Sequence, residues 1–318
     1  MVLRLLLMTL VLAPGVNAQT RMVEDALGIV EVPVEPKRIV SLNDASITHP
    51  LIELGAPIIG SHGRLGPAGT PYLRGLRDFT GEGFEDHGIT FLGAFNQLDA
   101  ELIAALDPDL IIAPPWHREG MPRLERIAPV VTLPWSEAGS LDVYRLIAEA
   151  SGRLDQFERM LEGYQDRIAQ LRSWVDRPEE INITMLQAWE GQISAYGDYG
   201  AFTQVTRDVG FGVPPRIAEY QGPSMSFSTE LLPELQADFV FDTFEPNFGD
   251  TPQTPGERFE QALPGWCEHL FACRNHQYVV LERSKVMGES FAAYHYVIDQ
   301  LTTHIVGRDY VLRRGSGG

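Results

Sequence analysis

The stretches LDAELIAALDPDLII, residues 98–112, and FSTELLPELQADFVF, residues 227–241, decide the fold because one pattern occurs in both. Each stretch places a Glu, either Glu101 or Glu230, before an apolar pair, and continues with Leu, Asp and an apolar run. The pattern is typical of a helix that leads into a buried strand. The chain is therefore expected to contain two similar α/β units.

Strands and helices are predicted to alternate on either side of these stretches, after a hairpin at residues 21–34. Short loops between them predict a parallel sheet that is covered on both faces in each unit. The first unit is expected to have strands at 36–42, 58–64, 89–95, 109–116 and 130–135. The second unit is expected to have strands at 181–189, 192–197, 237–244 and 277–282, with helices at 201–211, 228–236 and 289–307.

A long helix is predicted between the two units. Residues 154–175 contain no turn signal, and apolar residues recur there at steps of three and four. Such a helix would be about 33 Å long, enough to extend across two lobes, although an ordinary long helix within one domain is the alternative. We therefore divide the chain into an N-terminal α/β lobe at 19–153, an interlobe helix at 154–176 and a C-terminal α/β lobe at 177–318.

The first 18 residues have the form of a secretory signal peptide. Arg4 precedes the apolar run Leu5–Ala13, and small residues suited to cleavage end at Ala18. The run is shorter than the roughly 20 residues that cross a membrane. A buried N-terminal helix is the alternative, but we expect an exported protein that begins near Gln19.

The charge and the cysteines limit the partners and the compartment. A formal charge of −18 disfavours nucleic acid, which is bound by Lys and Arg. The only two cysteines, Cys267 and Cys273, are expected to form a disulfide in an oxidising compartment. Free thiols, or a metal site that includes His269 and His276, are the alternatives.

Catalytic patterns are missing from the sequence. The chain has no G-x-S-x-G elbow, no P-loop and no H-E-x-x-H pair, and its eight histidines are scattered. We therefore predict no catalytic residue, no resident metal and no cofactor, and expect that the protein is not an enzyme. An exported hydrolase or metalloenzyme with two lobes is the competing hypothesis.

The loops after the predicted strands contain the candidate ligand-binding residues, since ligands of open α/β sheets bind outside the carboxyl ends of strands. Aromatic residues gather there and indicate a sizeable, partly apolar ligand. Each one alone could equally be a buried loop anchor or a solvated surface group. The candidates are Asn43, Arg64, Trp116, His117, Arg118, Trp189, Tyr196, Tyr199, Phe244 and Met287.

Several segments together resemble one family, the periplasmic substrate-binding proteins of ABC importers for ferric siderophores, haem and cobalamin. These segments are EPKRIVSL (35–42), LIELGAPIIG (51–60), AELIAALDPDLIIA (100–113), RIAPVV (126–131) and FSTELLPELQADFVF (227–241). The resemblance implies two lobes joined by one rigid helix at 155–175, with the ligand between them. It also implies a monomer in the periplasm and a two-fold permease in the inner membrane as its partner.

Ferric-hydroxamate binders are the subgroup that the chain resembles most, through residues 191–211 and 287–301. The chain has Phe95 where those proteins often have an Arg, and Trp116–His117 where they have a Tyr. A hydroxamate- or citrate-type ferric siderophore is the expected ligand. Haem, for which His117, Tyr196 or Tyr199 would be axial ligands, and cobalamin are the alternatives.

The two glutamates of the repeated pattern have a specific role in this family. From the residues alone, Glu101 and Glu230 would each stabilise the first turn of a helix. The resemblance implies in addition that the two carboxylates dock onto arginines of the permease, because carboxylates pair well with guanidinium groups.

Overall fold

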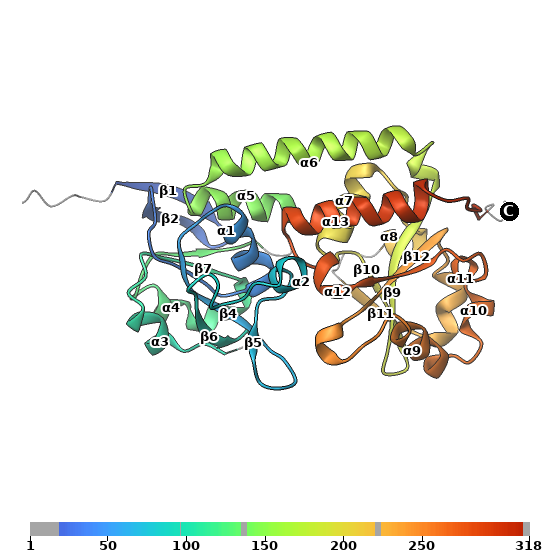
Figure 1. Cartoon of the computed structure of the whole chain (residues 1–318), viewed down its shortest axis with the longest axis horizontal. Coiled ribbons are helices and arrows are strands. Elements are labelled where there is room, and N and C mark those ends of the chain that lie inside the picture. Colours follow the sequence, from blue (N-terminus) through green and yellow to red (C-terminus); the bar gives the residue numbers. More distant parts are fainter. Residues whose placement is uncertain (1–18, 96, 135–138, 220–223, 314–318) are drawn as a thin grey trace, which may run out of the picture.

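The computed structural model describes residues 19–95, 97–134, 139–219 and 224–313. Two β-sheets form the centres of two lobes that lie side by side beneath one long helix (Figure 1). The predicted signal peptide, residues 1–18, lies outside the described residues. Within the described part of the chain, no helix has the length and apolar character needed to cross a membrane.

The N-terminal lobe is built on a sheet with the strand order β5-β4-β3-β7-β8, and β6 pairs with β4. All its pairings are parallel except that between β4 and β5. Its central strands are apolar and fully buried, as expected where helices cover both faces. The strands are β3 (Ile39–Ser41), β4 (Ile58–Leu65), β5 (Pro71–Tyr72), β6 (Thr90–Ala94), β7 (Leu110–Ala113) and β8 (Val130–Thr132), preceded by the hairpin β1 (Thr20–Asp25) and β2 (Gly28–Pro33).

Short helices connect the strands of this lobe. The side chain of Asp99 caps α3 by accepting hydrogen bonds from the backbone N–H of Glu101 at 3.1 Å and of Leu102 at 2.9 Å. Glu101 therefore lies in the first turn of a helix, as predicted. The helical segments are η1 (Asp44–Thr48), α1 (His49–Glu53), α2 (Leu76–Thr80), α3 (Ala100–Ala105), η2 (Pro115–Gly120), α4 (Met121–Leu124) and α5 (Ser140–Ala150).

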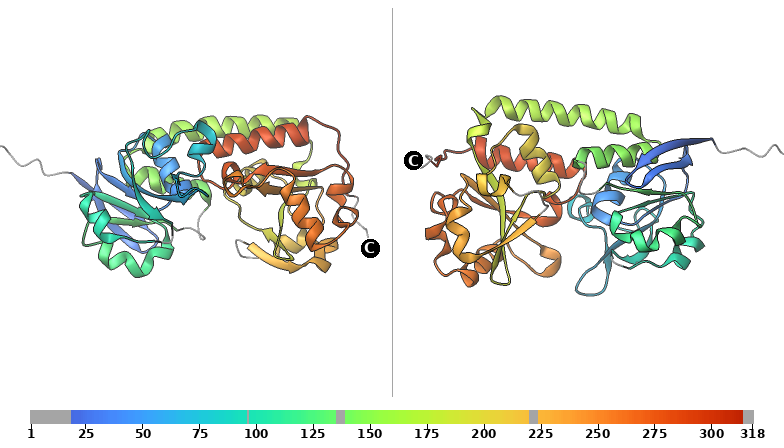
Figure 2. Two further views of the ribbon diagram at one scale, coloured as in Figure 1. Left: turned by 60° about the horizontal axis from the view of Figure 1, so that its bottom comes forward. Right: turned by 180° about the vertical axis from the view of Figure 1, so that it is seen from behind.

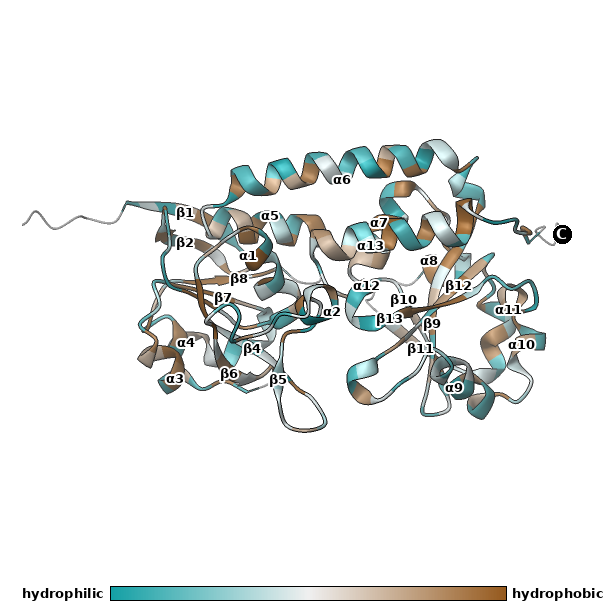
Figure 3. Ribbon diagram, in the orientation of Figure 1, coloured by the Kyte–Doolittle hydropathy of each residue, from teal (hydrophilic) through white to brown (hydrophobic). Residues whose placement is uncertain are grey.

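The long helix α6, Leu154–Trp174, extends along both lobes (Figures 1 and 2). Hydrophilic and hydrophobic bands alternate along it, and its buried residues are Phe157, Tyr164, Ile168 and Leu171 (Figure 3). This stripe packs on α5 from the first half of the chain and on α7 (Ala201–Val209) and α13 (Phe291–Leu301) from the second half.

The C-terminal lobe has a mixed sheet with the order β11-β10-β9-β12-β13. The prediction of a parallel sheet is wrong for β10 and β11, which pair antiparallel. Glu190 and Gly191 both have positive φ and form a two-residue hairpin turn, which is too short for the crossover that parallel strands need. The strands are β9 (Ile183–Trp189), β10 (Gln192–Tyr196), β11 (Ser224–Ser228), β12 (Phe239–Phe244) and β13 (Tyr278–Glu282).

The predicted helix at 228–236 is also corrected. The segment is a 3₁₀ turn, η4 (Thr229–Glu234), and the Ser228 side chain makes no capping hydrogen bond. Pro233 lies inside the turn and has no N–H to donate, so an α-helix cannot develop. The remaining segments are η3 (Pro178–Glu180), α8 (Pro215–Ala218), η5 (Pro246–Phe248), α9 (Thr254–Ala262), α10 (Trp266–His269), α11 (Phe271–Arg274), α12 (Arg283–Val286) and η6 (Thr302–Val306).

The two lobes are joined by a partly buried polar contact beneath α6. Glu53 on α1 accepts hydrogen bonds from the backbone N–H of Phe291 at 2.9 Å and of Ala292 at 2.8 Å, at the start of α13. It also accepts one from the hydroxyl of Tyr144 at 2.7 Å. Burial raises the pKa of Glu53. A carboxylate of one lobe thus satisfies the free N–H groups at a helix start in the other lobe.

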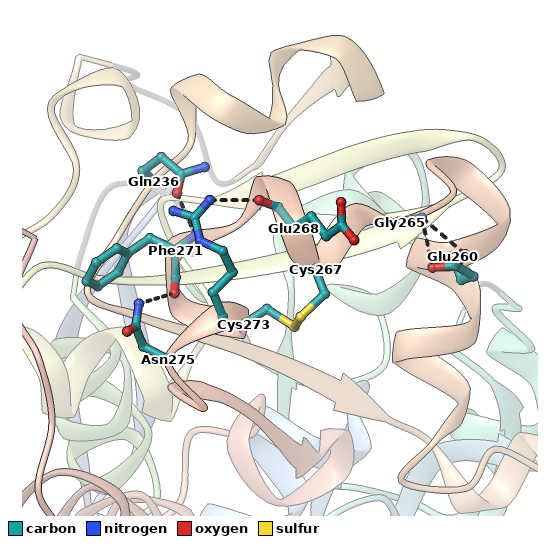
Figure 4. The surroundings of a disulfide bond; sticks show 9 residues. Gln236, Glu260, Gly265, Cys267, Glu268, Phe271, Cys273 and Asn275 are labelled. Carbon is teal, nitrogen blue, oxygen red and sulfur yellow. Dashed lines mark hydrogen bonds between the residues drawn. A yellow bond between two sulfur atoms is a disulfide. The ribbon is translucent and has the colours of Figure 1, made fainter.

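Cys267 and Cys273 form a disulfide that connects α10 and α11 (Figure 4). Nearby polar groups fix the same turn: Arg274 donates to the Glu268 carbonyl at 2.7 Å, and the Phe271 N–H donates to the Gln236 side chain at 2.7 Å. Because both sulfur atoms are in the disulfide, neither the free-thiol nor the metal-site alternative applies to them.

Candidate ligand-binding site between the lobes

A cavity of about 620 Å³ lies between the lobes, and residues from both lobes form its walls. We call it the interlobe cavity. The N-terminal lobe contributes residues from the end of β4 and from the segment after β5, whereas the C-terminal lobe contributes the ends of β9, β10 and β12 and the loops that follow strands. The lining residues are Arg64, Arg74, Gln187, Ala188, Trp189, Ser194, Tyr196, Asp242, Thr243, Glu245, Phe248, Asp250, Arg258, Arg283 and Met287.

Four of the predicted ligand-binding residues line this cavity: Arg64, Trp189, Tyr196 and Met287. The Arg64 guanidinium lies 3.8 Å from the centroid of the Phe95 ring, and the Arg258 guanidinium lies 4.7 Å from that of Trp189. Trp189 is 58% exposed, so its indole ring is available to a ligand at the cavity mouth.

Three other predicted residues support the cavity without lining it. The buried Asn43 caps η1, because its side chain accepts a hydrogen bond from the Ser46 N–H at 2.9 Å. Tyr199 is buried, and its hydroxyl lies 2.9 Å from that of Thr243, which does line the cavity. Phe244 lies between the lining residues Thr243 and Glu245 at the end of β12.

Trp116, His117 and Arg118 are not brought to the interlobe cavity. Trp116 and His117 line a separate hollow of about 340 Å³ whose other residues all come from the N-terminal lobe. The buried ring of His117 lies 5.2 Å from that of His62, centroid to centroid, and burial lowers the pKa of His117. Arg118 is exposed and lines neither space.

Sequence reasoning missed several charged residues of the cavity. Arg74 and Arg258 come from segments where no strand was predicted. The expectation that ligands bind outside the carboxyl ends of strands therefore did not point to them. Arg283 is not such a case, because it directly follows β13 and its place in the cavity agrees with the expectation that loops after strands supply the cations of the cleft. Asp242 lies within β12, and an acidic residue in an otherwise apolar strand is the feature of the sequence that could have indicated it.

Two of the cavity arginines have carboxylate partners. Arg74 donates to both oxygens of the fully buried Asp44, with its Nη2 at 2.6 Å from Oδ1 and its Nε at 2.9 Å from Oδ2. Burial would raise the pKa of Asp44, but its contacts with Arg74 lower it on balance. Arg258 pairs with Asp250 at 2.7 Å.

The buried Asp242 forms part of the cavity wall on the side of the C-terminal lobe. Its carboxylate accepts hydrogen bonds from the Tyr278 hydroxyl at 2.7 Å and from the Thr243 N–H at 2.6 Å. Burial raises the pKa of Asp242 to about 7, because little solvent reaches the charged form. The site can therefore change its charge within the physiological pH range.

The two glutamates of the repeated pattern lie away from this cavity. Glu101 and Glu230 are both exposed, one on each lobe, and neither is in an ion pair with another described residue. A hollow of about 630 Å³ surrounds Glu101 and includes Arg123, but only the N-terminal lobe forms it. The interlobe cavity is the better candidate for a ligand because both lobes enclose it.

Known proteins of similar sequence include binding proteins for iron(3+)-hydroxamate and for petrobactin. The chain is 25% identical over 223 residues to the iron(3+)-hydroxamate-binding protein FhuD of Bacillus subtilis (strain 168). This match covers 67% of this chain and 66% of FhuD. It is 27% identical over 166 residues to the petrobactin-binding protein YclQ of the same organism. This match covers 50% of this chain and 51% of YclQ. The chain thus spans about two thirds or less of these relatives.

Solved structures share the fold over most of the chain. Staphylococcus aureus SirA complexed with staphyloferrin B matches with a TM-score of 0.75 and 20% identity, over 90% of this chain and 98% of that structure. The FhuD protein from S. pseudintermedius matches with a TM-score of 0.73 and 19% identity, over 91% of this chain and 99% of that structure. The family model described as periplasmic binding protein matches residues 83–253, which is more than half of the chain. The chain therefore belongs to the periplasmic binding protein family.

Proposed function

We propose that this protein captures a ferric siderophore in the interlobe cavity and delivers it to the permease of an ABC importer. The cavity itself is the observation that carries the proposal, because it lies between two lobes and combines guanidinium groups with exposed aromatic rings. Its volume is within the range of sites that enclose small-molecule ligands, roughly 300–1,000 Å³. The named ligands of FhuD, YclQ and SirA support iron chelates as the ligand class.

The cavity walls suit the two parts of such a chelate. Trp189 and Phe248 are 58% and 69% exposed, and their rings would cover the organic shell of the ligand. Guanidinium groups would bind its oxygen atoms. Because α6 and the Glu53 contact connect the lobes, we expect only small closure on binding, in contrast to proteins that close about a flexible hinge.

The cellular setting belongs to the same proposal. We expect export to the periplasm with cleavage near Ala18, and action as a monomer. The membership of the family supports a transport role rather than an enzymatic one.

Tryptophan fluorescence tests ligand capture. Ferric hydroxamates, ferric catecholates, ferric citrate, haem and cobalamin are titrated into the protein, and quenching is expected with at least one ferric siderophore at micromolar concentration. Trp189→Phe should remove most of the quenching, whereas Trp174→Phe, at the far end of α6, should not. Quenching by haem or cobalamin alone, or by no compound, would refute the siderophore assignment.

Docking to the permease is tested with Glu101 and Glu230. The double variant Glu101→Ala/Glu230→Ala should abolish import into permease-containing vesicles and leave ligand affinity unchanged, because electrostatic matching orients the two proteins. The matched control is Glu162→Ala/Glu179→Ala, two exposed glutamates of which one lies in the middle of α6 and the other in η3. Unchanged import in the first variant would contradict the docking role.

A further inference from the structure

Three guanidinium groups converge on the interlobe cavity from both lobes. Arg64 and Arg74 belong to the N-terminal lobe and Arg283 to the C-terminal lobe, and all three line the cavity. The pKa of Arg64 is lowered to about 10, by burial first and by the charges of Arg74 and Arg283, whereas Asp44 raises it. The charges of Arg74 and Arg283 therefore both act on Arg64, at a place where solvent screens them poorly.

Only one of these three groups has a carboxylate partner in the structure. Asp44 neutralises Arg74, but no carboxylate of the described residues lies within 4.0 Å of a side-chain nitrogen of Arg64 or Arg283. Arg64 lies over the Phe95 ring, and its Nε is buried without a hydrogen-bond partner among the described residues. The Arg283 guanidinium lies 5.8 Å from the centroid of the Tyr199 ring.

An acidic side chain of the cavity, Glu245, is already engaged by other groups. One of its oxygens accepts hydrogen bonds from the Asn247 N–H at 3.1 Å and from its side-chain amide at 2.9 Å. The other oxygen accepts one from the Ser284 hydroxyl on α12 at 2.7 Å. Glu245 is thus held by its own loop and by α12, and it pairs with neither Arg64 nor Arg283.

An anion placed between the lobes would meet both unpaired groups. A guanidinium group pairs with a planar carboxylate through two parallel hydrogen bonds, and such charged bonds are stronger than neutral ones. A neutral or cationic chelate would offer only its iron-bound oxygens, which carry partial charge, so it would gain less from these groups and would still have to displace water from them. The arrangement therefore favours carboxylate oxygens over neutral hydroxamate groups.

We propose, on the basis of the function proposed above, that the siderophore selected by this cavity carries free carboxylate groups that Arg64 and Arg283 bind from opposite lobes. The ligand class is a ferric carboxylate-type chelate. Neither a trihydroxamate nor a tris-catecholate offers free carboxylate groups to the two guanidinium groups.

Binding titrations with three probes test this selectivity. The probes are ferric citrate formed in excess citrate, ferrioxamine B as a cationic trihydroxamate, and ferric enterobactin as a trianionic tris-catecholate. The wild-type protein should bind ferric citrate at least about tenfold more tightly than either of the other two probes. Titration with iron-free citrate measures the part of the affinity that the carboxylates supply alone.

The variants Arg64→Gln and Arg283→Gln test the two contacts separately. Each should weaken ferric citrate binding by about 10- to 100-fold, as expected for the loss of a charged hydrogen-bonded pair, and should change ferrioxamine B binding by less than about threefold. Arg207→Gln, an exposed arginine on α7, is the matched control and should change neither affinity. Melting curves of all variants identify any loss of folding.

The outcomes separate this inference from the proposed function. Tighter binding of ferrioxamine B or ferric enterobactin than of ferric citrate would overturn the carboxylate inference and leave siderophore capture in place. Equal losses for all probes in the Arg64 or Arg283 variants would also overturn it. Absence of binding by every ferric chelate would refute the proposed function, and the inference with it.

Discussion

The buried ion pair between Asp44 and Arg74 leads to the most quantitative prediction about stability. Asp44 is fully buried and accepts three hydrogen bonds from Arg74, two from the guanidinium and one from the backbone N–H at 3.1 Å. In Asp44→Asn the amide oxygen can still accept, but the charge and at least one of these hydrogen bonds are lost. The guanidinium, whose side chain is only 13% exposed, then remains without a counter-charge.

The expected cost follows from that geometry. Removal of one partner of a buried ion pair costs about 3–5 kcal/mol, and the remaining amide contact places Asp44→Asn near the lower end, at about 3–4 kcal/mol. For a chain of this size this corresponds to a decrease of about 6–10 °C in melting temperature. Because Arg74 lowers the pKa of Asp44 below its ordinary 3.8, the stabilisation is present above that pH and is lost as the pH falls through the folded-state pKa.

Urea unfolding followed by circular dichroism measures this cost. The control is Asp299→Asn, which removes an exposed ion pair with Arg167 and should change the free energy of unfolding by less than about 1 kcal/mol. The double variant Asp44→Asn/Arg74→Gln should recover part of the loss, because no unpaired charge stays buried. A loss below about 1 kcal/mol in Asp44→Asn, or no recovery in the double variant, would refute the reasoning.

Three further predictions concern other parts of the molecule. Cys267→Ser should lower the free energy of unfolding by about 2 kcal/mol, the chain-entropy value for so short a loop, and a reductant should lower the urea midpoint of the wild type but not of the variant. Glu53→Ala leaves two N–H groups of α13 and the Tyr144 hydroxyl without an acceptor. In the same urea assay it should lower the free energy of unfolding by about 2–4 kcal/mol, a value that already subtracts the cost of burying the carboxylate. An anionic ligand should bind more weakly as the pH rises through about 7, because Asp242 then ionises in the cavity. Affinities measured by calorimetry at pH 6 and pH 8 should differ for the wild type and should agree for Asp242→Asn.

The long helix and the repeated helix–strand unit of the first lobe could be predicted because their signals are local. The apolar stripe of α6 and the Asp99 cap of α3 are visible in the sequence as spacings and residue types. The strand β10 was predicted, but its antiparallel direction was missed, because strand direction depends on the connection and the two-residue turn Glu190–Gly191 was not recognised as a hairpin. The strand β11 was not predicted.

The candidate site could be predicted only in part, for a different physical reason. Trp189 and Arg64 lie at the carboxyl ends of β9 and β4, where ligands of such sheets are expected to bind, so the sequence could indicate them. Whether an arginine is paired depends on which residue the fold places beside it, and Asp44 is 30 residues away from Arg74 in the chain. His117 illustrates the opposite error, since a loop position after a strand became a buried ring beside His62.

The connection of the lobes by α6 and Glu53 has a consequence for the rate of iron uptake. Because only small closure on binding is expected, the proposed docking residues Glu101 and Glu230 should be nearly the same distance apart in an empty and in a loaded molecule. Empty copies then compete with loaded copies for the same permease. Uptake would depend on the ratio of loaded to empty protein, so overproduction of the protein under scarce iron chelate would slow import instead of accelerating it.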